Sequence, residues 1–72
     1  MGESAAGNPL YASLRSQADR FPTEMREIEI SLVAQEFKRA FGMMTRLKER
    51  GLWQPSPAAE EALEDFWWEY GQ

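Results

Sequence analysis

The stretch TEMREIEISLVAQEFKRAFGMMTRLKER, residues 23–50, decides the fold of this 72-residue chain. It ends as helices commonly end, with Lys48 and Arg50 in the last turn and Gly51 directly after it. Its apolar residues recur at the spacing of one face of an α-helix. This main stripe consists of Ile30, Val33, Phe37, Phe41, Met44 and Leu47. The pattern predicts one long helix over about residues 23–50.

Two further helices are predicted on either side of this stretch. Asn8-Pro9 and Ser56-Pro57 each place a capping side chain before a proline, which is a common start of a helix. They predict helices over about 9–20 and 57–70. The expected fold is therefore all-α: a small three-helix domain, residues 8–72, built on an αα-hairpin of the second and third helices. Residues 1–7 are small and polar and are expected to be a disordered leader.

One segment favours a different fold. Residues 28–32 alternate between apolar and polar side chains, which is the pattern of a strand. A strand followed by a helix is typical of ribbon-helix-helix repressors and antitoxins, in which paired strands read the DNA groove. Glu27 and Glu29 would then lie near the phosphates, which is unfavourable. This DNA-binding protein is kept as an alternative, together with a structural subunit of a larger complex.

The composition argues against catalysis and against cofactor or metal binding. The chain has no cysteine and no histidine, so the usual nucleophile, general base and metal ligands are missing. The net charge of −4 disfavours a nucleic-acid partner. No apolar run is long enough to span a membrane and no signal peptide is visible, so a cytoplasmic location is expected. We expect no enzyme, no cofactor and no metal site.

Some apolar residues fall outside the main stripe and are candidates for binding a partner. Ile28, Leu32 and Met43 lie opposite that stripe on the predicted long helix, where the helix predicted over about 9–20, a second copy or another protein must cover them. Trp67 borders the apolar face of the last helix and is expected to be buried. Trp68, one step of about 100° further on, is expected to point outward. Its predicted neighbours on that face are carboxylates, namely Glu61, Glu64 and Asp65.

These features predict a small acidic protein that binds another protein, with Trp68 as an anchor and the carboxylates matched to a basic surface. Such a protein acts as an inhibitor, an antiactivator or an assembly chaperone; a homodimer is also expected from the second apolar face. The segment from Phe21-Pro22 to Ile28-Glu29-Ile30 resembles the start of TraM-type quorum-sensing antiactivators. The C-terminal half does not match that family, and no site residue is carried over from it.

Overall fold

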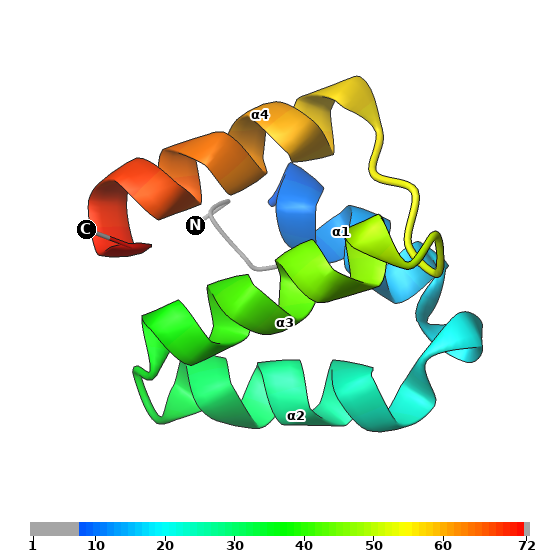
Figure 1. Ribbon diagram of the computed structural model, residues 1–72, viewed down its shortest axis with the longest axis horizontal. Helices are drawn as coiled ribbons and strands as arrows, with labels where there is room; N and C mark the ends of the chain where they lie inside the picture. The colour runs from blue at the N-terminus through cyan, green and yellow to red at the C-terminus, as the bar shows by residue number, and fades with distance from the viewer. Residues whose placement is uncertain (1–7, 72) are drawn as a thin grey trace.

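The computed structural model describes residues 8–71, so the predicted leader over 1–7 lies outside the described residues. Between residues 8 and 71 the chain forms four α-helices and no strand (Figure 1). A 3-10 turn, η2, precedes the second helix, and a π-helical turn, η3, continues the fourth. The predicted all-α class is confirmed. The elements are α1 (Pro9–Ser16), η2 (Ala18–Arg20), α2 (Pro22–Val33), α3 (Phe37–Glu49), α4 (Pro57–Phe66) and η3 (Trp67–Gly71).

The two capped helix starts are confirmed. The Asn8 side chain accepts a hydrogen bond from the backbone N–H of Leu10 at 2.8 Å. The Ser56 hydroxyl accepts one from the N–H of Ala59 at 3.2 Å. Both side chains satisfy donors that a helix start leaves free. The first helix is shorter than predicted, because α1 ends at Ser16 and the chain continues as η2 rather than as helix to residue 20.

The single long helix predicted over 23–50 is wrong, because the chain reverses at residues 34–36. Gln35 adopts the left-handed conformation, with φ of 62°. The N–H of Glu36 bonds to the carbonyl of Ser31 at 2.8 Å, and the N–H of Gln35 bonds to that of Leu32 at 3.1 Å. This pair of bonds is a Schellman motif, which terminates a helix and turns the chain. The break therefore lies at a residue with a side chain, where glycine is the usual choice.

The helical hairpin is consequently formed by α2 and α3, which pack closely against each other (Figure 1). Residues 28–32 lie inside α2 and are helical, so the strand required by the ribbon-helix-helix alternative is not formed. Because of this reversal, the two halves of the predicted main stripe no longer lie on one continuous helix face. Ile30 and Val33 lie exposed, at 60% and 85%, whereas Met44 and Leu47 are buried.

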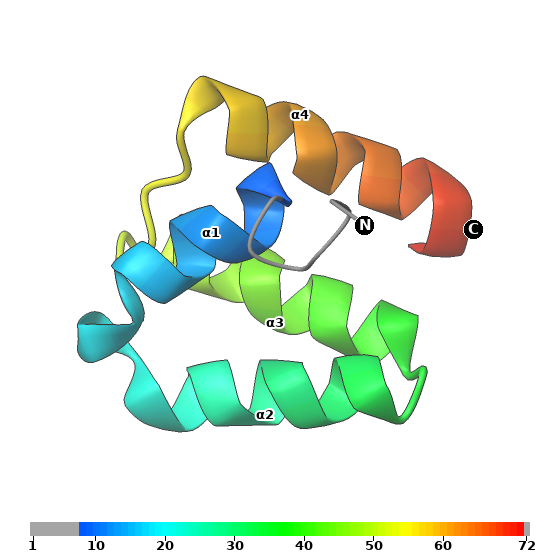
Figure 2. The ribbon, with the colours of Figure 1, turned by 180° about the vertical axis from the view of Figure 1, so that it is seen from behind.

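The fourth helix packs against α1 rather than along the whole of α3. Viewed from behind, α1 lies between α4 and the α2–α3 hairpin (Figure 2). The C-terminal turn η3 returns to contact α3. At the other end of α3, the Lys48 ammonium lies 3.6 Å from the Glu60 carboxylate at the start of α4. The basic end of α3 therefore lies beside the acidic start of α4.

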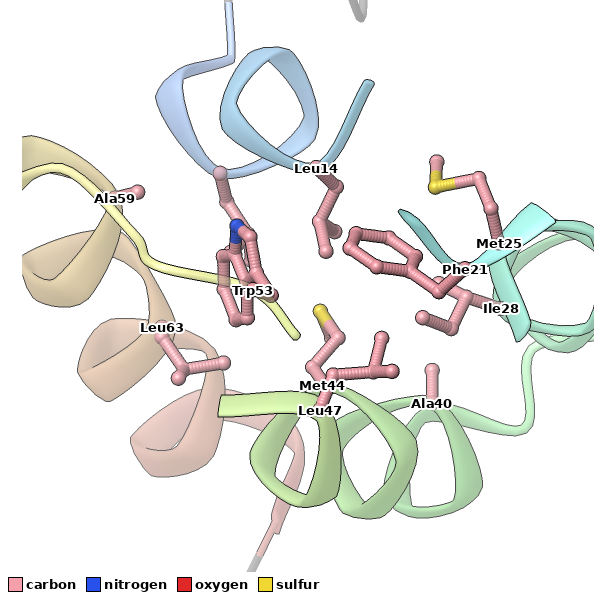
Figure 3. Packing of buried hydrophobic residues seen from close by; sticks show 11 residues of the cluster. Leu14, Phe21, Met25, Ile28, Ala40, Met44, Leu47, Trp53, Ala59 and Leu63 are labelled. Atoms are coloured by element: carbon pink, nitrogen blue, oxygen red, sulfur yellow. The ribbon is translucent and has the colours of Figure 1, made fainter. Parts of the chain in front are cut away.

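The centre of the core is a tryptophan from a connecting segment. Trp53, between α3 and α4, is fully buried and packs among side chains of α1, α3 and α4 (Figure 3). Its indole N–H donates to the Ser13 hydroxyl at 3.1 Å. The next residue, Gln54, exchanges two hydrogen bonds of 2.8 Å with the Gln17 side chain. These bonds fix the connection against α1.

Gly42 does not produce a kink or a close helix crossing, two outcomes that its place in the middle of a helix suggests. α3 runs through it from Phe37 to Glu49. The residue is exposed, and nothing lies within 4 Å of the place where a side chain would begin. The backbone freedom of glycine therefore has no visible use at this position.

Candidate protein-interaction surface

Aromatic side chains connect the N-terminal part of α3 to the C-terminal end of the chain. The Phe37 and Tyr70 rings stack with their centroids 4.1 Å apart. Phe41 lies 5.1 Å from the Trp67 ring and 6.4 Å from the Phe66 ring. We call Phe37, Phe41, Phe66, Trp67 and Tyr70 the aromatic cluster. It holds η3 against α3 by contacts that aromatic rings favour at these separations.

The π-helical turn η3 determines how these rings are presented. Gly71 is buried beneath the Trp67 indole, and any side chain at residue 71 would overlap the six-membered part of that ring. Only glycine allows the backbone to come this close. A π-helical turn is wider than an α-helical one, so residues 67–71 do not follow the facing of α4. The aromatic residues of η3 therefore do not divide into one buried and one exposed side.

The expected burial of Trp67 is wrong, because its side chain is 40% exposed. The indole packs on Phe41 and on Gly71, and its exposed part meets solvent. Trp68 is 64% exposed and Tyr70 is 38% exposed. The predicted outward position of Trp68 is confirmed, and its role in binding stays a prediction. Sequence reasoning missed that the three residues share the surface of η3.

The carboxylates proposed for the interaction surface are exposed along α4, but they divide between two sides. Glu61 and Glu64 line a groove between α3 and α4. Asp65 lies outside this groove. The groove also contains apolar and polar side chains of both helices and of the turn η3. Its lining consists of Phe41, Thr45, Lys48, Pro57, Glu60, Glu61, Leu63, Glu64 and Trp67.

The second apolar face predicted from Ile28, Leu32 and Met43 is wrong. Ile28 is fully buried in the core, and the other two are partly buried against it. The cause is the turn at Gln35, which folds α3 back onto the side of α2 that carries Ile28. The exposed aliphatic residues of α2 are instead Ile30 and Val33. Assignment of faces on one uninterrupted helix could not have found them.

A polar cluster at the other side of the molecule ties α1 to α2. The Tyr11 hydroxyl donates to the Glu29 carboxylate at 2.8 Å, and the Arg15 guanidinium lies 3.5 Å from the same carboxylate oxygen. The hydrogen bond to Glu29 raises the pKa of the Tyr11 hydroxyl above its usual 10.0. All three groups are accessible to solvent and their contacts are satisfied by one another, so the cluster links the helices.

The described residues contain no group of carboxylates arranged to hold a metal ion. No helix within residues 8–71 is long and apolar enough to cross a membrane. Comparisons of the chain with protein-family models, with curated proteins and with solved structures find no match. The geometry of the surface is therefore the basis for a functional proposal.

Proposed function

We propose that this chain is a non-catalytic protein-binding protein that acts by occupying the surface of a partner. An inhibitor, an antiactivator and an assembly chaperone all work in this way, and so does a structural subunit within a complex. The proposal rests on one observation: Trp68 is 64% exposed on an acidic helical end of the molecule. Tryptophan is enriched among the few residues that carry most of the binding energy of an interface.

The magnitude of this exposure supports the proposal. A large aromatic side chain buries roughly 150–250 Å² when it is fully covered. Covering the exposed part of Trp68 would remove about 160 Å² from water, which corresponds to about 4 kcal/mol at 25 cal/mol per Å². This is an upper value, because ordering the two partners costs part of it. It is enough for one side chain to dominate an interface.

The charge around the anchor indicates the kind of partner. Glu64, Asp65 and Glu69 are exposed on α4 and η3, and none of them forms an ion pair within residues 8–71. Carboxylates in this arrangement favour approach of a basic protein surface and repel nucleic-acid phosphates. Because residues 28–32 are helical, no observation favours the DNA-binding alternative.

Photo-crosslinking in the cells that produce the protein tests this proposal. Three baits are compared: the wild-type chain, Trp68→Ala, and Val33→Ala, which truncates another exposed apolar side chain. We expect a protein that is retained by the wild type and by Val33→Ala, is lost with Trp68→Ala, and binds the purified chain directly. Recovery of the same proteins at the same yield on all three baits would contradict the proposal.

A further inference from the structure

The groove between α3 and α4 has the composition of a site for a cationic side chain. Leu63 lies at its base and is 6% exposed, and Phe41 and Trp67 form an aromatic wall with ring centroids 5.1 Å apart. The carboxylates of Glu61 and Glu64 line the same groove from α4, the helix that continues into η3 and Trp67. Apolar base, aromatic wall and carboxylates therefore lie within one concave surface.

The charges within the groove are not balanced. Glu60 pairs with Lys48 at 3.6 Å. Glu61 and Glu64 have no ion-pair partner within residues 8–71, although both line the same groove. An incoming cation would therefore meet two unpaired carboxylates and need not displace an existing partner.

We propose that this groove binds a basic segment of the partner protein, with an arginine or lysine side chain against the face of Trp67. This inference rests on the proposed function, and it names the part of the partner that the site recognises. The indole face attracts a cation through its quadrupole, and the carboxylates add charge-assisted hydrogen bonds. The aliphatic stem of the same side chain covers Leu63 and Phe41, as long basic side chains do on apolar surfaces.

A second copy of this chain is a weaker occupant. It offers basic residues on α1, η2, α2 and α3, but each copy carries a net charge of −4, so two copies repel each other at a distance. A basic partner is attracted instead. Self-association is therefore an outcome that would count against this assignment, and light scattering on the purified chain measures it.

The test begins with a phage-displayed library of random peptides selected on the immobilised wild-type chain. Selected peptides are synthesised, and their dissociation constants are measured by fluorescence anisotropy. We expect peptides enriched in arginine and lysine, with binding that weakens as salt is raised. Peptides without enriched basic residues, or a chain that is dimeric with the groove covered, would overturn the proposal.

Two matched double variants then locate the site. Glu61→Lys/Glu64→Lys reverses the charges that line the groove, and Asp65→Lys/Glu69→Lys makes the same change in net charge outside it. We expect the first to weaken peptide binding about tenfold and the second less than about threefold, as local charge pairs predict. Equal loss in both variants would indicate attraction to the overall charge and would refute the groove.

A second matched pair tests the aromatic wall. Trp67→Leu alters the groove and Trp68→Leu does not, although the residues are adjacent. We expect peptide binding to weaken with Trp67→Leu and to persist with Trp68→Leu, in variants whose circular dichroism and melting match the wild type. Should Trp67→Leu lower the melting temperature, Glu61→Lys/Glu64→Lys decides the result. A cellular partner that is lost with Trp68→Ala but kept by every groove variant would refute this inference and leave the proposed function standing.

Discussion

The strongest prediction about stability concerns Trp53, because a connecting segment supplies the centre of the core. Truncation to alanine in such a position costs about 3–5 kcal/mol, through lost burial and the cavity that remains. A chain of this size has a total stability of roughly 3–5 kcal/mol. Since Trp53 is fully buried, we expect Trp53→Ala to be unfolded at room temperature.

A milder change resolves the components of this effect. Trp53→Phe keeps an aromatic ring but removes the indole N–H that donates to Ser13 at 3.1 Å. We expect it to cost about 2 kcal/mol, of which about 1 kcal/mol is the hydrogen bond. Ser13→Ala leaves the indole N–H without its acceptor and should cost about 1–3 kcal/mol. The double variant should lose less stability than the sum of the losses in the two single variants, because neither partner of the hydrogen bond then remains unpaired.

Urea unfolding followed by circular dichroism measures the wild type and the four variants, with Trp68→Phe as a control at an exposed indole. The wild type and the control should unfold at closely similar urea concentrations. If Trp53→Ala unfolds cooperatively near the wild-type midpoint, the central position of Trp53 is wrong. If the costs of Trp53→Phe and Ser13→Ala add to within about 0.5 kcal/mol, the hydrogen bond between them contributes nothing measurable.

Four further predictions concern single positions. Gln35→Gly should raise the free energy of unfolding by about 0.5–1 kcal/mol, because residue 35 has a φ of 62°, which glycine adopts without strain. Gly42→Ala should raise it by about 1 kcal/mol, because residue 42 lies within α3 and has free space around it. An unchanged urea midpoint in either variant would contradict the explanation given for that variant. Thr45→Val should add about 1 kcal/mol, since the Thr45 hydroxyl is buried without a hydrogen-bond partner among the described residues; a lower melting temperature would show that the hydroxyl is satisfied. The Tyr11 pKa is raised in the folded state, so its contribution to stability is present below pH 10.0 and is lost as the pH rises through the raised pKa; urea midpoints on either side of pH 10.0 should show a fall that Tyr11→Phe lacks.

The sequence predicted the ends of helices correctly where the residue that caps the helix interacts only with residues close to it in the chain. Asn8 and Ser56 cap the backbone two or three residues ahead. Gly51, with φ of 75°, ends α3 through a bond from the N–H of Leu52 to the carbonyl of Leu47 at 3.0 Å. Each of these features needs only a few adjacent residues. Propensity and capping rules are therefore sufficient to find them.

The turn at Gln35 is the same Schellman motif, but it lacks the glycine that usually marks this motif in a sequence. The carbonyls of Ser31 and Leu32 accept hydrogen bonds in the same pattern as the carbonyls of Leu47 and Lys48 at the end of α3. A left-handed residue with a side chain costs about 1–2 kcal/mol. Packing of α3 onto the buried face of α2 offsets this cost, and that gain depends on contacts between distant residues. The apolar stripe across residues 30–47 runs through the turn, so periodicity alone predicts an unbroken helix.

The C-terminal end shows why the candidate surface was predicted only in part. Steps of about 100° along an α-helix place Trp67 on the buried side and Trp68 on the exposed side. In the structure a π-helical turn begins at Trp67, and the spacing no longer holds. Both indoles then reach solvent, one along the groove and one beyond it. Such turns are frequent at functional sites because they move side chains off the regular face. The failure of helical periodicity at residues 67–71 therefore coincides with the surface that we propose for binding.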